Sequence, residues 1–224
     1  MAGDGDKRDC MLEGRGLACR RGDRLLFAGL DFRIAAGELL LLRGPNGSGK
    51  SSLLRLIAGL IPADAGSLFW NGGPILDREA WGALMAYLGH LDGAKSELTV
   101  REDLRFWLGW RGLAPASGHR AEEALARLGL DHLADLPCRL LSAGQRRRLA
   151  LARVAVSDAR LWLLDEPFTA LDDAATEIAR QMIAEHCAAG GLVVMSAHGP
   201  VPVLPSVRLL DLGVAVVDRA EAPA

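Results

Sequence analysis

A glycine-rich stretch, "GPNGSGKS", runs from Gly44 to Ser51 and has the residue spacing of a phosphate-binding loop. Glycines keep side chains out of the way, so several backbone N–H groups can converge on phosphate oxygens. Lys50 adds a compact positive charge for the terminal phosphates, and Ser51 offers a hydroxyl to Mg²⁺. Because the stretch follows an apolar run and precedes a helical pattern, it predicts a nucleoside triphosphate site with Mg²⁺.

Two carboxylates end the apolar segment "LWLLDEP", Leu161 to Pro167. At the tip of a buried parallel strand, Asp165 can reach the coordination shell of Mg²⁺. Glu166 can polarise a water molecule for attack on the terminal phosphate. Two solvated acids at the start of a turn would give the same letters, but the phosphate-binding loop favours a catalytic pair.

A second feature suited to anions is "LSAGQ", Leu141 to Gln145, directly before a helical pattern. The first N–H groups of a helix have no partner within the helix, and small side chains leave them open to an anion. The sequence thus contains two phosphate-binding features that lie far apart along the chain.

The elements expected around these motifs form an α/β core. Partial alternation of apolar residues over Met11–Cys19 and Leu30–Ala35 predicts an antiparallel amino-terminal sheet. The apolar run "GELLLLRG" predicts a strand buried on both faces, and "KSSLLRLIAGL" predicts a helix. Further strands are expected in "GSLFWNGG", "LMAYLG", "LWLLDEP", "GLVVMSA" and "VRLLDLGVAVVD", and a further helix over residues 173–189.

From about residue 92 to residue 160, amphipathic helical patterns replace the strand patterns. The segments "TVREDLRFWLGWRG" and "HRAEEALARLGLDHLADL" predict helices, with no strand between them. We therefore predict a single domain over residues 10–220 that contains a helical subdomain over residues 92–160.

Composition limits the classes of protein that fit. Half of the 224 residues are hydrophobic, which suffices for a core without disulfides or structural metals. A net charge of −2 gives no general attraction to nucleic acid, and the four cysteines lack metal-ligand spacing. The charged first residues contain no apolar secretion segment, and no apolar run is long enough to span a bilayer. We expect a soluble, cytosolic chain, or one that a partner holds at a membrane.

The order of "GPNGSGKS", "LSAGQ" and "DEP" resembles that of the nucleotide-binding subunits of ABC transporters, over nearly the whole chain. The resemblance implies an α/β fold: a P-loop NTPase core of the ABC ATPase type, an N-terminal antiparallel β subdomain and an inserted helical subdomain. It implies ATP and Mg²⁺ as cofactors, with Ser51 and Asp165 as metal ligands and Glu166 as a catalytic residue. The ATP-binding residues would be Gly44, Pro45, Asn46, Gly47, Ser48, Gly49, Lys50, Ser51 and Ser52.

The resemblance also answers why one chain carries two phosphate-binding features. In that family two copies form a homodimer on binding ATP, and the signature segment of one copy contacts the ATP held by the other. Here the signature would be Ser142, Ala143, Gly144 and Gln145, with alanine in place of one usual glycine.

Other residues match further family elements. Asp172, in "TALD", would belong to the D-loop that crosses the dimer interface, and His198, in "MSAHG", would be the catalytic switch histidine at the terminal phosphate. The run Arg146–Arg148 could suggest a nucleic-acid patch, but a solvated helix face with one arginine near the signature is the favoured interpretation.

Two positions depart from the family pattern. Arg21 stands where an aromatic side chain usually stacks on adenine, and arginine can stack with less selectivity. His90 and Leu91 stand at the Q-loop position, where a glutamine is usual. Leucine cannot coordinate Mg²⁺, so either His90 substitutes or the coupling to the membrane partner is altered; the sequence leaves both open.

The segment "YLGHLDGAKSELTVREDLRFW", residues 87–107, lies where this family faces its membrane subunit, and it resembles the ATP-binding subunits of cytochrome c maturation haem exporters. That implies a peripheral ATPase at the cytoplasmic face of the bacterial inner membrane, with integral membrane transporter subunits as partners and haem delivery to a periplasmic chaperone as its task. We expect no direct haem binding and no nucleic-acid partner. Two alternatives are an ABC transporter with another cargo and a soluble ABC ATPase without transport.

Overall fold

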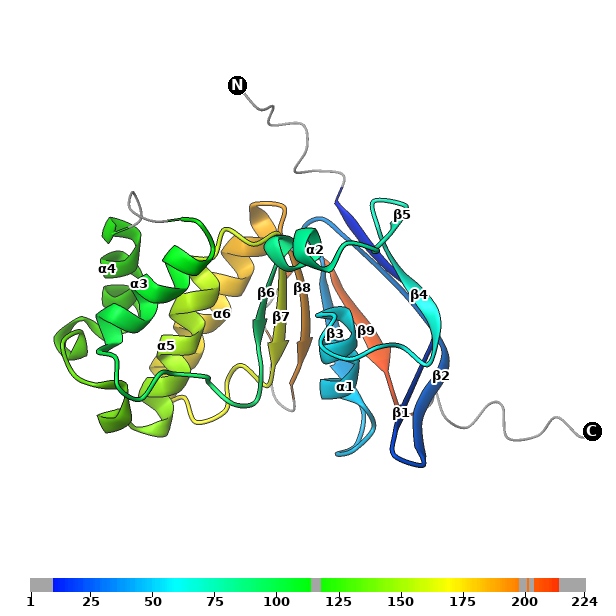
Figure 1. Ribbon diagram of the computed structural model, residues 1–224, viewed down its shortest axis with the longest axis horizontal. Coiled ribbons are helices and arrows are strands. Elements are labelled where there is room, and N and C mark those ends of the chain that lie inside the picture. The colour runs from blue at the N-terminus through cyan, green and yellow to red at the C-terminus, as the bar shows by residue number, and fades with distance from the viewer. Residues whose placement is uncertain (1–9, 114–117, 198–200, 202–203, 214–224) are drawn as a thin grey trace, which may run out of the picture.

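The computed structural model describes residues 10–113, 118–197, 201 and 204–213. Figure 1 shows three parts in a row: a group of helices, a parallel sheet, and an antiparallel sheet at the opposite end. The sequence motifs lie in the middle part and at its border with the helices.

The antiparallel sheet contains β1 (Met11–Arg21), β2 (Arg24–Ala35), β4 (Ala65–Trp70) and β5 (Gly73–Pro74), in the order β2-β1-β4-β5. The predicted antiparallel amino-terminal sheet is confirmed. β1 and β2 are longer than the alternating pattern indicated, because register shifts between Gly14 and Arg20 interrupt the period-2 pattern.

The parallel sheet contains β3 (Leu39–Arg43), β6 (Met85–Leu88), β7 (Leu161–Asp165), β8 (Leu192–Ser196) and β9 (Val207–Asp211), in the order β6-β7-β8-β3-β9. Every residue of β7 and β8 is buried, which explains their continuous apolar sequences. Since all five strands are parallel, the loops after β3 and β7 lie at the same edge of the sheet.

Helices cover the parallel sheet and extend beyond it. α1 (Lys50–Ile57), α2 (Arg78–Leu84) and α6 (Asp173–Ala188) flank the sheet, and α3 (Val100–Trp110), α4 (Gly118–Arg127) and α5 (Ala143–Ala155) form the helical group of Figure 1. The helix predicted through "HRAEEALARLGLDHLADL" ends earlier, at Arg127, because Gly129 adopts a φ of 64°; a short 3₁₀ turn, Asp131–Leu133, follows.

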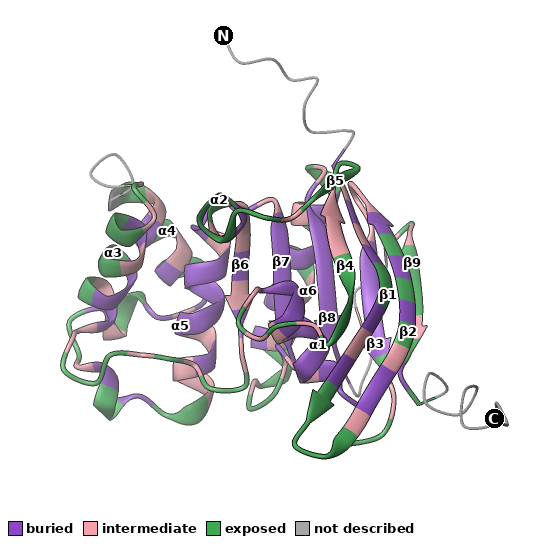
Figure 2. Cartoon of the chain, turned by 45° about the vertical axis from the view of Figure 1, so that its right-hand side comes forward, coloured by how far each residue is buried: buried purple, intermediate pink, exposed green. Residues whose placement is uncertain are grey.

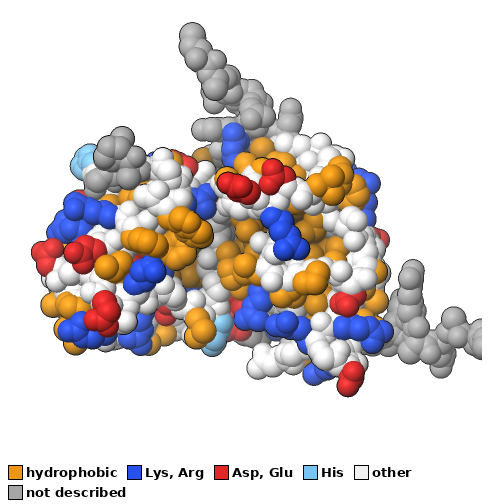
Figure 3. All heavy atoms as spheres, in the orientation of Figure 1, with side chains coloured by type: hydrophobic (Ala, Val, Ile, Leu, Met, Phe, Trp, Pro, Cys, Tyr) orange, Lys and Arg blue, Asp and Glu red, His pale blue; other side chains and the backbone are white. Residues whose placement is uncertain are grey.

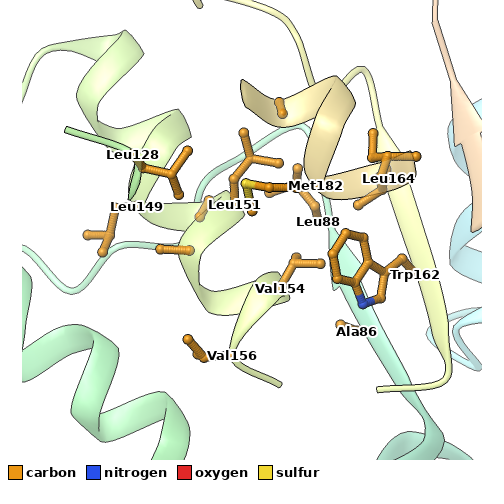
Figure 4. Close-up of a cluster of buried hydrophobic side chains, with 14 of the residues drawn as sticks. Ala86, Leu88, Leu128, Leu149, Leu151, Val154, Val156, Trp162, Leu164 and Met182 are labelled. Atoms are coloured by element: carbon orange, nitrogen blue, oxygen red, sulfur yellow. The ribbon is translucent and has the colours of Figure 1, made fainter. Parts of the chain in front are cut away.

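Two apolar clusters occupy opposite faces of the parallel sheet. Leu40 and Leu42 of β3 join α1 and the antiparallel sheet, whereas Leu39 and Leu41 join α5 and α6. Figure 2 shows the buried residues concentrated along β7 and β8. Figure 4 shows the second cluster, whose labelled members include Leu151 and Val154 of α5, Met182 of α6 and Trp162 of β7.

Candidate functional site

The phosphate-binding loop connects β3 to α1, as the sequence predicted. Pro45, Asn46 and Gly47 are exposed at its tip, while Lys50 is only 6% exposed. Lys50 Nζ donates to the carbonyl oxygens of Gly44 at 2.7 Å and Pro45 at 3.0 Å. Ser48 Oγ is buried and accepts no hydrogen bond from any described residue. The loop therefore presents a positive charge and unused polar groups at the first turn of a helix, an arrangement that suits a phosphate.

Gly49 fixes the loop against the antiparallel sheet. Its φ is 103°, and it is the residue before the first turn of α1. A Cβ at this position would lie 3.1 Å from the Phe27 ring and 3.2 Å from Leu26 Cβ. Only glycine tolerates both this positive φ and this short distance to β2. The loop therefore packs directly on β2.

The carboxylate of Asp165 lies next to the phosphate-binding loop. Asp165 Oδ1 accepts from Ser51 Oγ at 3.0 Å and from Ser196 Oγ at 2.8 Å. Its Oδ2 is buried and has no hydrogen-bond partner in the part of the chain that the structure describes. A buried carboxylate oxygen without a partner, beside a serine hydroxyl, is a donor set that fits a hard cation such as Mg²⁺. Ser196 was not predicted, because it follows from the pairing of β7 with β8.

Glu166 occupies a strained turn directly after β7. Its φ is 51°, which is unusual for a residue with a side chain. Its N–H lies 3.0 Å from Ser196 Oγ and 3.2 Å from the Ser196 carbonyl oxygen, and its Oε2 accepts from Thr169 Oγ1 at 3.3 Å. A non-glycine residue held in this conformation points to a functional constraint, which agrees with a catalytic carboxylate.

The signature residues cap α5. Ser142 Oγ accepts from the Gln145 N–H at 3.2 Å, and Gln145 Oε1 accepts from the Ser142 N–H at 2.8 Å. This reciprocal pair is a capping box, and Ala143 is exposed beside it. None of the hydrogen bonds that Ser142 and Gln145 make reaches the phosphate-binding loop of the same chain.

The signature packs on the predicted D-loop. A Cβ at Gly144 would stand 2.6 Å from the carbonyl oxygen of Ala170, so glycine allows the two segments to touch. Asp172 caps α6 by accepting from the Ala175 N–H at 2.7 Å. The two segments assigned to the dimer interface thus lie side by side in one chain.

Of the predicted site residues Arg21 and His198, the structure describes only Arg21. Arg21 is exposed at the end of β1, and its register partner is Arg24. The guanidinium near the phosphate-binding loop is that of Arg24, whose Nη1 would lie 3.6 Å from a Cβ at Gly47. The alignment of motifs did not indicate Arg24. His198 lies outside the described residues.

His90 and Leu91 lie on the exposed segment after β6, and Leu91 is 84% exposed. Beside this segment is a largely apolar hollow of about 380 Å³ between the helical group and the sheet. Figure 3 shows hydrophobic side chains on both sides of this hollow. Burial raises the pKa of Tyr87, which lines it and therefore stays neutral. Its lining includes Leu60, Tyr87, Leu91, Trp107, Trp110 and Arg111.

The predicted solvated face of Arg146–Arg148 is wrong for Arg147, which is 3% exposed. Arg147 lies one helical turn before Ala150 and Leu151, so it belongs to the buried face of α5. It donates to backbone carbonyls around Asp165 and Glu166 and to the Asp92 carboxylate. The 3.6-residue spacing of the apolar residues in α5 could have indicated that Arg147 is buried.

Two absences bear on other classes of site. Within the described ranges, no three His, Cys, Asp or Glu side chains gather as they would around a metal ion. None of the described helices combines the length and hydropathy needed to span a bilayer.

Known proteins are similar to this chain over most of its length. A sequence profile of the ABC transporter family matches residues 27–169. "Cytochrome c biogenesis ATP-binding export protein CcmA" of Paramagnetospirillum magneticum is 49% identical over 206 residues, covering 91% of this chain and 94% of that protein. The protein of the same name from Rhodospirillum rubrum is 50% identical over 200 residues, covering 89% and 84%.

A solved structure described as an ATP-binding subunit of an ABC transporter superposes with a TM-score of 0.80 at 25% identity, covering 91% of this chain and 87% of that one. The fold, the order of the motifs in this chain and the extent of these similarities all indicate the same family. The chain belongs to the ABC transporter family, as an ATP-binding protein similar to the CcmA proteins of cytochrome c biogenesis.

Proposed function

We propose that this chain binds and hydrolyses ATP as the ATPase subunit of a transporter for cytochrome c maturation, and that hydrolysis drives haem export to a periplasmic haem chaperone. The observation that supports it most is the contact between Ser51 and Asp165, which joins the phosphate-binding loop to the carboxylate strand. The names of the 49–50% identical relatives support the choice of cytochrome c biogenesis.

The chemistry is divided among the residues of the site. Lys50 and the backbone N–H groups of residues 44–52, apart from Pro45, which has none, hold the phosphates of ATP. Ser51 and Asp165 would hold Mg²⁺, which neutralises charge on the transferred phosphoryl group. Glu166 orients the attacking water and accepts its proton. Arg21, with Arg24 beside the loop, would face the nucleotide base and phosphates, and His198 would contact the terminal phosphate.

The signature completes the site from a second copy. Among the residues that the structure describes, Ser142 and Gln145 form hydrogen bonds only within α5 and its cap, so the remaining N–H groups of its first turn are available to another molecule. Phosphate charge needs donors from both sides, and ATP therefore holds two copies together as a homodimer. The D-loop residue Asp172 lies at the same interface.

Membrane subunits occupy the hollow beside residues 87–93. Apolar side chains exposed around a concave surface favour a protein partner over solvent. This partner places the chain at the cytoplasmic face of the bacterial inner membrane. The single domain over residues 10–220, with the helical subdomain over residues 92–160, is part of the same proposal.

Two substitutions test the ATPase role. Glu166→Gln keeps the shape and removes the base, so ATP binding persists while turnover falls by about 100-fold or more. Lys50→Ala loses ATP binding, because the phosphate charge is no longer compensated. Fluorescence measures nucleotide binding, and phosphate release measures turnover. Gel filtration with ATP measures whether the variants form the dimer.

A deletion strain tests the cargo. Loss of c-type cytochromes, restored by the wild-type chain and not by Glu166→Gln, is the expected result. Normal c-type cytochromes in the deletion strain would contradict the haem assignment, whereas normal turnover by Glu166→Gln would contradict the catalytic one.

A further inference from the structure

One buried side chain joins the catalytic turn to the segment beside the hollow. Arg147 of α5 donates from Nη2 to the carbonyl oxygens of Asp165 at 2.5 Å and Glu166 at 2.7 Å, and from Nε to that of Pro167 at 3.3 Å. These three acceptors are consecutive, so the guanidinium holds the backbone on which the carboxylates are mounted.

The other branch of the guanidinium reaches the segment that follows β6. Arg147 Nη1 donates to the Gly89 carbonyl oxygen at 2.8 Å and to Asp92 Oδ1 at 3.0 Å. A guanidinium has five N–H donors, and here five acceptors take them. The arginine side chain is 4% exposed and the Asp92 side chain 20%, so water does not replace these bonds.

A second arginine of α5 holds the same segment. Arg153 Nη1 donates to the Asp92 carbonyl oxygen at 2.7 Å, and its Nε donates to Asp103 Oδ2 of α3 at 2.6 Å. Both ends of the segment from Gly89 to Gly93 are therefore bonded to one helix, and four of its residues line the hollow: Gly89, Leu91, Asp92 and Gly93.

We propose that Arg147 is a positioning residue that couples the placement of residues 89–93 to the orientation of the Glu166 carboxylate. The inference rests on the proposed function, because it assigns a regulator to the same catalytic carboxylate. A partner seated in the hollow fixes residues 89–93, and Asp92 and the Gly89 carbonyl fix the guanidinium. The guanidinium in turn fixes the peptide groups on both sides of Glu166.

The conformation of Glu166 makes it responsive to such a link. With a φ of 51°, the residue depends on surrounding bonds for its orientation. Ser196 holds its N–H from β8, and Arg147 holds its carbonyl oxygen from α5. Loss of one of these supports moves the carboxylate relative to the attacking water, whereas the phosphate-binding loop has other supports in β2 and β3. The effect falls on turnover and not on ATP binding.

The test uses the full chain co-purified with its membrane subunits, and measures kcat and KM for ATP. Arg147→Gln lowers kcat by about ten- to a hundredfold and leaves KM for ATP within about twofold, since a small displacement of a catalytic group acts on rate. Arg148→Gln is the matched control: Arg148 is the next residue of α5, and it donates to the Leu128 carbonyl oxygen instead. Its kcat equals that of the wild type.

A second variant separates positioning from folding. Asp92→Asn removes the charge of the ion pair but keeps the acceptor oxygen and the arginine. Because the change is smaller, this variant still tests the link if Arg147→Gln fails to fold. It lowers kcat by about three- to tenfold, and adding it to Arg147→Gln produces no further loss, because both act through one contact. Kinetics of Asp92→Asn equal to those of Arg148→Gln, or a rise in KM without a fall in kcat, would overturn the inference. A wild-type complex that turns over no ATP would instead refute the proposed function.

Discussion

At the scale of single residues, the candidate site depends on how few hydrogen-bond donors reach the Asp165 carboxylate. One oxygen is shared by the hydroxyls of Ser51 and Ser196, and the other is left without a hydrogen-bond partner among the described residues. Burying a charge with incomplete hydrogen bonding is costly unless a cation completes the set. This environment fits the Mg²⁺ site that we propose for Asp165, and the two serine hydroxyls satisfy one of its oxygens without the metal.

Ser196→Ala tests this at the level of stability. The variant removes one donor from Asp165 and one acceptor from the Glu166 N–H, so it destabilises the fold by about 1–3 kcal/mol. In an Asp165→Ala background the same change costs less, since part of what Ser196 satisfies is gone. Urea unfolding of the four proteins gives the coupling energy. Equal costs in both backgrounds would show that the Ser196 hydroxyl acts independently of Asp165.

At the scale of elements, the return from α6 into β8 depends on one close fit. The His186 ring stacks on Trp162 of β7, with ring centroids 4.0 Å apart and an interplanar angle of 9°. Gly191, directly before β8, passes under this ring, and a Cβ there would lie 2.2 Å from His186 Nε2. The missing side chain thus allows α6 to pack closely on the sheet.

Gly191→Ala is therefore expected to destabilise the protein by about 1–3 kcal/mol, because the stacked ring has no room to retreat. His186→Ala removes the obstacle, so Gly191→Ala added to His186→Ala costs little more. Gly109→Ala in α3 is the matched control: no atom lies within 4 Å of the added Cβ, and alanine favours the helix, so stability stays equal or rises slightly. Thermal unfolding measures all four variants, and a cost for Gly191→Ala that persists without His186 would contradict the steric argument.

The elements and motifs were predictable where the signal is local. Short buried strands and the phosphate-binding loop carry their pattern within a few residues, so "LWLLDEP" and "GPNGSGKS" were placed correctly. Bulges in β1 hid the strand length, because they break the alternation that identifies a strand. Ser196 and Arg147 were missed as site residues because their partners come from other strands and loops, which only the tertiary structure brings together.

At the scale of the whole molecule, the parallel sheet separates two apolar clusters and carries the site at one edge. The antiparallel sheet supports the phosphate-binding loop on one side, and α5 reaches the carboxylate turn from the other. The groups that we propose as catalytic are thus held in place by packing against both clusters. Any condition that weakens the packing of one cluster is expected to disturb the site before the chain unfolds completely.

Acid provides such a condition through His186, whose ring belongs to α6 and contacts β7. Burial lowers the pKa of His186 from 6.5 to about 4. The folded state keeps this ring neutral while the unfolded chain protonates it below pH 6.5. Between pH 6.5 and pH 4 the unfolded state therefore binds more protons, and stability falls as the pH falls, by about 2 kcal/mol at pH 5.

His186→Phe keeps an aromatic ring against Trp162 and removes the titration. The free energy of unfolding in urea, measured at pH 7, 6 and 5, is expected to decline less steeply for this variant than for the wild type. The carboxylates of Glu38 and Glu185, whose pKa values are lowered by hydrogen bonds from their partners despite the opposing effect of burial, lose stabilisation in acid in both proteins, so they cancel in the difference. Parallel curves for the two proteins would show that His186 does not set the acid sensitivity of the fold.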